Sequence, residues 1–200
     1  METEKVKIPD DALSYGVYRK TVKLLLDRNT TTGNDVTQER VDYSKLNEYR
    51  MDRMDKNTVL IPELAEKIRN LQVPQIWLVL TEAWCGDSAQ NIPVLAKVAD
   101  ASDGKVKLLL ASRDANPELM DHFMTEGGRS IPKLIRTEAA TGKLLGTWGP
   151  RPVPGQELMH QWKNSGGTVT KDEFHKQLHL WYARDRGATL QAELLAMLNN

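Results

Sequence analysis

Two short apolar runs constrain the fold of this chain more than any other feature: IWLVL at 76–80, and the segment KVKLLLASRD at 105–114. Continuous apolar runs of this length are typical of strands that are buried on both faces. A helix-length segment, 85–102, separates them, and Pro93 inside it predicts a kink. A second helix over 116–128 and a hairpin around the turn ATGK follow. The order βαβαββ predicts an α/β layer architecture with parallel crossovers.

The segments around these strands carry helical patterns. Residues 44–57 are strongly charged and have few apolar positions, so we expect a surface helix or an ordered arm there. A rigid proline-rich connection, GPRPVPG, precedes the last helices, and Thr170 with Glu173 forms a capping-box pattern at the start of one of them. The remaining expected helices cover 9–29, 61–72, 157–165, 170–186 and 188–198.

These patterns suggest a division of the chain into three parts. We expect an α/β core over 61–162, a helical N-terminal extension over 1–60 and a C-terminal helical extension over 163–200. The extensions are expected to pack onto the central sheet, so that the three parts form one globular unit.

Composition excludes several classes of function. The 27 basic and 27 acidic residues give a formal net charge of zero, so there is no overall electrostatic signal for nucleic acid or for an anionic membrane. No apolar run approaches the roughly 18 residues of a membrane span. The N-terminal sequence METEKVKIPDD has no apolar signal region, and a single cysteine excludes an internal disulfide. We therefore expect a cytoplasmic protein with no nucleic-acid or membrane partner.

The single cysteine, Cys85, stands between a strand and a helix. The N-terminus of a helix favours anions, which lowers a thiol pKa and favours the nucleophilic thiolate. Ser88 follows one turn later, where its hydroxyl can bond the thiolate, whereas the carboxylate of Asp87 disfavours it. The residues alone leave two interpretations open: a reactive thiol, or a small, buried and inert side chain.

The residues around Cys85 resemble the thioredoxin superfamily over roughly 61–162. WCGDS resembles the WCGxC active site, and Pro93 falls where thioredoxins kink the active-site helix. SIPKLI matches the strand start whose proline is cis and faces the catalytic cysteine, and GKLLGTWG matches the final hairpin. More narrowly, the motifs EAWCGD and GRSIPK are similar to those of an atypical bacterial thioredoxin-like family. This resemblance implies a central mixed sheet flanked by helices, with extra helices at both termini.

The resemblance also assigns site residues. It implies a catalytic set of Cys85, Ser88 and Pro132, and a substrate groove of Trp84, Gly86, Asp87, Ile131, Trp148 and Gly149. Two departures affect the second half of a thioredoxin cycle. Ser88 replaces the resolving cysteine, and Val79 replaces the buried acid; Glu82 lies nearby, but strand alternation argues against a simple replacement.

Three functional hypotheses remain. In the first, a monothiol oxidoreductase uses Cys85 to attack a disulfide-bearing or S-thiolated protein, and an external thiol resolves the adduct. For this hypothesis Arg129 and Arg136 are candidates for binding an acidic low-molecular-weight thiol. In the second, the fold is a binding scaffold and the cysteine is vestigial.

In the third hypothesis the protein resembles the monothiol glutaredoxins, in which two chains hold an iron–sulfur cluster between them through their CGFS motifs. The sequence at 85–88, CGDS, matches it at three positions of four, but Trp84 and the acid at Asp87 fit poorly. His175 and His179 stand four apart on an expected helix and have no third ligand, so we expect them to face solvent or a groove. No metal and no cofactor is expected.

Overall fold

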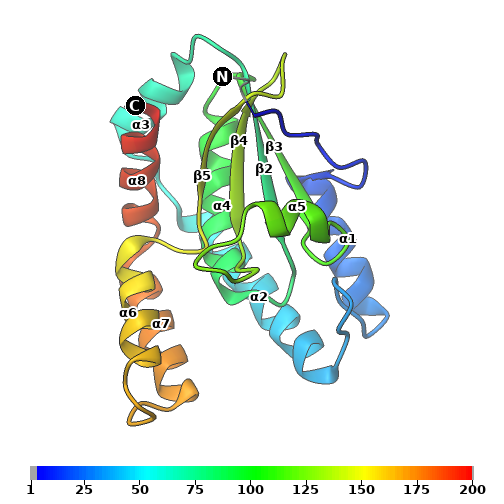
Figure 1. Ribbon diagram of the computed structural model, residues 1–200, viewed down its shortest axis with the longest axis vertical. Helices are drawn as coiled ribbons and strands as arrows, with labels where there is room; N and C mark the ends of the chain where they lie inside the picture. Colours follow the sequence, from blue (N-terminus) through cyan, green and yellow to red (C-terminus); the bar gives the residue numbers. More distant parts are fainter. Residues whose placement is uncertain (1–3, 200) are drawn as a thin grey trace.

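The computed structural model describes residues 4–199 and contains one five-stranded sheet in the order β1-β3-β2-β4-β5 (Figure 1). Both apolar runs of the sequence form central strands, and the hairpin around ATGK forms the last two strands. The strands are β1 (Leu13–Ser14), β2 (Gln75–Thr81), β3 (Val106–Ser112), β4 (Lys133–Glu138) and β5 (Leu144–Trp148).

Helices make up most of the remaining described chain. The charged segment expected as a surface helix or arm is part of a longer helix, α2, of 20 residues, one face of which is buried. The capping box expected at Thr170 and Glu173 is present at the start of α7. The helices are α1 (Tyr15–Asp27), α2 (Gln38–Asn57), α3 (Pro62–Arg69), α4 (Gly86–Asp100), α5 (Pro117–His122), α6 (Val153–Lys163), α7 (Lys171–Asp185) and α8 (Ala188–Asn199).

The sheet is mixed, as the fold class predicts. Strands β2 and β3 are parallel and joined by α4, but β4 runs antiparallel to both β2 and β5. The expectation of a parallel crossover is therefore wrong for the connection through α5. The chain leaves β3 and enters β4 at the same end of the sheet, so the connection that contains α5 does not cross over.

Strand alternation divides the core into two clusters. Trp77 and Val79 of β2 face a large cluster that includes α4, whereas Leu78 and Leu80 face the opposite side of the sheet. The second cluster also contains Cys85, beneath α5 and the N-terminal segment. The thiol therefore belongs to the smaller of two layers.

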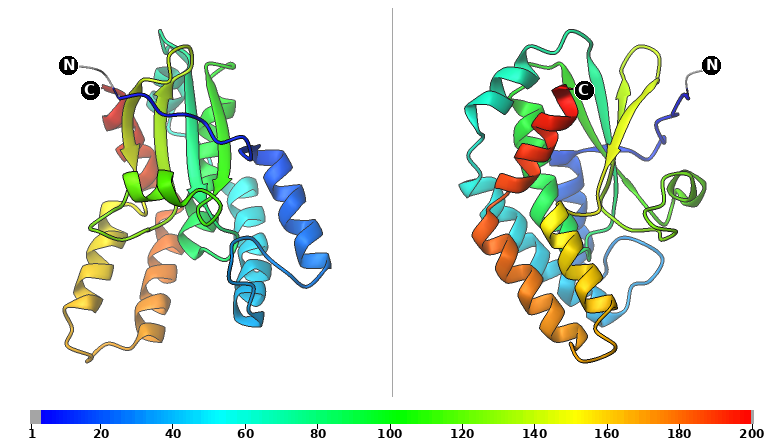
Figure 2. Two further views of the ribbon diagram at one scale, coloured as in Figure 1. Left: turned by 45° about the vertical axis from the view of Figure 1, so that its right-hand side comes forward. Right: turned by 60° about the vertical axis from the view of Figure 1, so that its left-hand side comes forward.

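Both ends of the chain contribute to the larger cluster. Tyr18 of α1, Met51 of α2 and Leu194 of α8 are buried in it together with the central strands. The α1–α2 pair and the α6–α7 hairpin extend past the same end of the sheet, the end at which β2 leads into α4 (Figure 2). Within residues 4–199, no helix combines the length and apolar character that a membrane span requires.

Gly149, directly after β5, lies in close contact with the loop that precedes β4. Gly149 has a φ of +114°, and a Cβ added there would lie 2.1 Å from the carbonyl oxygen of Pro132. We predict that Gly149→Ala lowers the free energy of unfolding by about 3 kcal/mol or more, because backbone must move to accept the methyl group. The matched control is Gly166→Ala, at a φ of +62° with open space around it, which should cost only about 1 kcal/mol. Urea unfolding of both variants measures the difference, and equal losses would contradict the assigned contact.

Candidate functional site

Cys85 is the N-cap residue of α4, directly after the loop that leaves β2. Its sulfur accepts a hydrogen bond from the backbone N–H of Ser88 at 3.5 Å, and its thiol donates to the carbonyl oxygen of Ile131 at 3.2 Å. The peptide bond between Ile131 and Pro132 is cis. The structure therefore brings the three residues of the expected catalytic set, Cys85, Ser88 and Pro132, to one place.

The thiol is protonated in this environment. Burial raises the pKa of Cys85 to about 11, and the nearby carboxylate of Asp87 adds to the increase. Hydrogen bonds from Ser88 and the positive charge of Arg151 lower the pKa of Cys85, but by less than burial and Asp87 raise it. The donated bond to Ile131 is what a neutral thiol makes. The N-terminus of α4 therefore does not lower the pKa of Cys85, which was one of the possibilities that the sequence left open.

A raised pKa slows the thiol but does not remove its reactivity. Relative to a free cysteine of pKa about 8.5, a pKa of about 11 reduces the thiolate fraction at pH 7 roughly 300-fold. A more basic thiolate is also a better nucleophile, which restores roughly 10-fold. The net effect is a thiol roughly 20- to 30-fold slower than a free cysteine at neutral pH.

Asp87 connects the active-site helix to the C-terminal part of the chain. Its carboxylate is only 8% exposed and is neutralised by Arg151, whose Nε and Nη2 both donate to Oδ2. The hydroxyl of Tyr182 on α7 donates to the other oxygen, Oδ1, at 2.7 Å. Asn91, one turn along α4, donates to the Tyr182 hydroxyl. This network fixes α7 beside the thiol.

The N-terminal extension holds the other side of the same loop. Ala83 lies two residues before Cys85; its carbonyl accepts from the side chain of Asn47 on α2, and its N–H donates to the hydroxyl of Thr32, each at 2.8 Å. Trp84 is packed between two guanidinium groups, with Arg40 3.8 Å and Arg113 4.9 Å from its ring.

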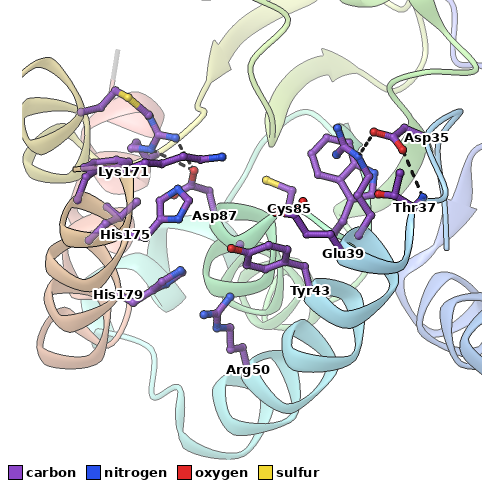
Figure 3. Close-up of a pocket in the computed structure, with 17 residues that line it drawn as sticks. Asp35, Thr37, Glu39, Tyr43, Arg50, Cys85, Asp87, Lys171, His175 and His179 are labelled. Atoms are coloured by element: carbon purple, nitrogen blue, oxygen red, sulfur yellow. Dashed lines mark hydrogen bonds and ion pairs between the residues drawn. The ribbon is translucent and has the colours of Figure 1, made fainter. Parts of the chain in front are cut away.

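A cavity of about 500 Å³ lies between the two extensions. Figure 3 shows Lys171, His175 and His179 of α7 facing Tyr43 and Arg50 of α2 across it, with Cys85 and Asp87 at the end formed by α4. The α7 residues are spaced by four and therefore share one face of their helix. We call this cavity the interhelical cleft.

The expected groove residues divide between two locations. Trp84, Gly86 and Asp87 line the interhelical cleft, Ile131 contacts the thiol, and Gly149 contacts Pro132. Trp148 does not join them. It pairs with Leu134, whose side chain faces the larger cluster, and its indole N–H donates to Glu193 of α8 at 2.6 Å. Pairing in register puts Trp148 on the opposite face of the sheet from Cys85.

The two departures from a thioredoxin cycle are also visible. The hydroxyl of Ser88 is buried and accepts from Thr81 at 2.8 Å, and Val79 lies fully buried in the larger cluster. Glu82 is fully buried as well, but one of its oxygens accepts from Ser112 and from the N–H of Asp114 at the end of β3. The hydrogen bonds of Glu82 therefore go to the end of β3 and the loop that follows it.

The charges near the thiol differ from those expected. Arg129 is paired with Asp121 on the surface, and Arg136 is buried over Trp77 with its Nη1 on a carbonyl of α8. Neither lines the interhelical cleft. The basic residues that do are Arg40, Arg50, Arg151 and Lys171.

Sequence reasoning missed these residues. Arg50 and Arg151 lie in segments interpreted only as a charged helix and a rigid connection, Lys171 starts a helix interpreted only for its cap, and Arg40 lies outside every expected element. A signal was available at His175 and His179, whose spacing marked one face of α7. Among residues 4–199 no group of three potential metal ligands is found.

The mixed sheet, the thiol at the start of the helix after a central strand, and the adjacent cis proline define a thioredoxin-like protein. A family model described as thioredoxin matches residues 33–163. The chain therefore belongs to the thioredoxin family.

Similar proteins support the fold and leave the activity open. Thioredoxin 1 of Nostoc sp. (strain PCC 7120) is 35% identical over 52 residues, which cover 26% of this chain and 46% of that protein, less than half of its length. A crystal structure of a protein of unknown function from Pseudomonas aeruginosa is similar with a TM-score of 0.57 and 18% identity, covering 94% of this chain and 98% of that one. An HIV epitope scaffold gives a TM-score of 0.54 at 17% identity, covering 94% and 98%.

The protonation state of Cys85 can be measured by alkylation with iodoacetamide across pH. Because the pKa of Cys85 is raised to about 11, we expect the rate for the folded protein to rise about tenfold per pH unit from pH 7 to pH 10 without a plateau. The same chain unfolded in urea should level off above about pH 8.5. A plateau near pH 8.5 in the folded protein would contradict the buried, neutral thiol.

The Asp87 network predicts that removing the hydroxyl oxygen of Tyr182 has a large effect on stability. Tyr182→Phe removes the donor to Asp87 and leaves a buried carboxylate oxygen without it, so we expect a loss of about 1–3 kcal/mol in the free energy of unfolding. Tyr49→Phe is the control, since Tyr49 is 75% exposed and should change stability by less than about 0.5 kcal/mol. Denaturant unfolding compares the two, and a neutral Tyr182→Phe would mean that the network does not hold α7.

Proposed function

We propose that this protein is a monothiol-disulfide oxidoreductase in which Cys85 forms a mixed disulfide that an external thiol resolves. The observation that carries the proposal is the position of the sulfur: it caps α4, lies 3.2 Å from the carbonyl oxygen that precedes the cis proline, and faces a cavity. Membership of the thioredoxin family supports thiol–disulfide exchange as the type of reaction.

The reaction requires two exchange steps. In the first, the Cys85 thiolate attacks one sulfur of a disulfide-bearing or S-thiolated protein; a new S–S bond forms, the old one breaks, and the other sulfur leaves as a thiolate that takes up a proton. In the second, an external thiolate attacks the partner sulfur of the adduct, forms a new disulfide with it and expels Cys85. No step uses Ser88 or Val79, the positions at which the family's resolving chemistry is replaced.

The pKa of the thiol gives this cycle a particular kinetic character. Since burial raises the pKa of Cys85, its thiolate is scarce and the first attack is slow. A basic thiolate is also a poor leaving group, so the second step is slow as well. We therefore infer a long-lived mixed disulfide and a reaction suited to capture followed by release on demand.

A non-catalytic scaffold is the second candidate, and the same raised pKa favours it. A buried neutral thiol that donates to a carbonyl is compatible with a purely structural residue. Under that alternative the helical extensions would hold a partner and the folded state would not exchange disulfides.

The test uses a peptide whose cysteine carries a mixed disulfide with 2-mercaptoethanol. We expect wild-type protein to form a covalent adduct visible by intact mass, free 2-mercaptoethanol to release it over repeated cycles, and Cys85→Ser to form none. Folded protein that forms no adduct while the urea-unfolded chain does would favour the scaffold. An adduct that no added thiol releases would also overturn the proposal.

A matched variant checks the geometry of the same site. Ser88→Cys restores a second thiol one helical turn from Cys85, so it should release the captured partner without added thiol by forming an internal disulfide.

A further inference from the structure

Four cationic side chains line the interhelical cleft, Arg40, Arg50, Arg151 and Lys171, against three carboxylates, Asp35, Glu39 and Asp87. Arg40 is paired with Asp35, and Arg151 with Asp87. Among residues 4–199, no carboxylate lies within ion-pair distance of Arg50 or of Lys171. These two groups come from the opposite walls of the cleft, α2 and α7.

Arg50 is the more informative of the two because it is half-buried. Its one side-chain hydrogen bond is donated to the amide oxygen of Asn47 at 2.8 Å, and burial together with the neighbouring Arg53 lowers its pKa. A Cβ added at Gly86 would lie 3.3 Å from its Nη1, so the guanidinium is next to the residue that follows Cys85. A partly desolvated cation without a counterion is a favourable position for an anion.

His179 provides a second polar group that is not satisfied. Its Nδ1 is buried and has no hydrogen-bond partner among residues 4–199, and a Cβ added at Gly86 would lie 3.1 Å from its Cε1. Burial and the charge of Arg50 lower its pKa to about 4, with His175 and Arg53 acting in the same direction and Asp87 against it. The ring is therefore neutral at pH 7 and can donate a hydrogen bond without adding charge.

We propose that the interhelical cleft binds the anionic group of a low-molecular-weight thiol, whose sulfur is the one that Cys85 exchanges with. Arg50 and His179 receive the anion beside Gly86, Lys171 adds positive charge from about 12 Å further along α7, and Cys85 stands at the adjoining end of the same cavity (Figure 3). The volume of about 500 Å³ is within the range of small-molecule sites. This inference rests on the proposed exchange at Cys85 and assigns its small substrate.

The exchange balances with this ligand as the only added reactant. The Cys85 thiolate attacks the ligand-side sulfur of a protein mixed disulfide, the protein thiolate leaves and is protonated, and the ligand remains on Cys85. A second molecule of the thiol attacks the ligand sulfur of this adduct, a symmetrical disulfide departs, and Cys85 is regenerated. The net reaction converts the protein mixed disulfide and one free thiol into a protein thiol and the symmetrical disulfide.

Three disulfides of similar size but different charge test the proposal: dianionic 3,3′-dithiodipropionate, neutral bis(2-hydroxyethyl) disulfide and dicationic cystamine. We expect wild-type Cys85 to form its adduct about tenfold faster with the anion than with the neutral probe, and most slowly with cystamine. Each rate is divided by the rate of the urea-unfolded chain with the same probe, because the leaving thiols of the three probes differ in pKa. The raised pKa of Cys85 then cancels when the three normalised rates are compared.

Variants separate the cleft from its surroundings. Arg50→Gln should bring the ratio of the anionic to the neutral rate from about ten close to one, and Lys171→Gln should lower this ratio in part, because Lys171 is more distant. Lys45→Gln is the matched control, since Lys45 lies on the same helix, is exposed and does not line the cleft. Lys171 is exposed at the start of α7, so its variant tests the charge even where Arg50→Gln disturbs folding.

The outcomes distinguish the two proposals. If no probe reacts with the folded protein, the exchange function fails. If all three react at equal rates, or if Lys45→Gln acts like Arg50→Gln, only the anion site fails. NMR titration gives an independent measurement: the pKa of His179 should rise in the dithiodipropionate adduct, because an anion favours the charged ring, and stay near 4 in the hydroxyethyl adduct.

Discussion

The buried carboxylate of Asp87 is the interaction on which the arrangement around the thiol depends. One oxygen is neutralised by Arg151, and the other accepts from Tyr182 on α7. A carboxylate buried this deeply is tolerated only when paired and hydrogen-bonded, so the first turn of α4 requires the C-terminal hairpin. The hairpin in turn forms one wall of the interhelical cleft.

The opposite wall is fixed by neutral hydrogen bonds to backbone. Asn47 and Thr32 bond the two polar backbone atoms of Ala83, and the loop before Cys85 is thereby attached to α2 and to the segment that precedes it. The family's exchange site thus lies between an ionic attachment on the C-terminal side and a backbone attachment on the N-terminal side. Both attachments come from outside the central strands, so the chemical environment of Cys85 is set by the extensions as much as by the sheet.

The sheet and the position of the thiol were predictable because their signals are local. The run at 76–80 is apolar enough to define a central strand, and the residues after it carry the family motif. The cleft was not predictable, because burial on α2 involves polar side chains such as Asn47 whose partners lie 36 residues away. Arg151 was hidden in a proline-rich connection, and the side of the sheet that Trp148 occupies follows only from its pairing with Leu134.

The bond between Asp87 and Arg151 has a consequence for how the thiol and the C-terminal hairpin influence each other. Cys85 raises the pKa of Arg151, and Arg151 lowers that of Cys85, which are two expressions of one coupling free energy. The attachment of the C-terminal hairpin and the acidity of the thiol are therefore not independent. A change that weakens the contact of Arg151 with Asp87 and moves the guanidinium away also raises the pKa of Cys85 further.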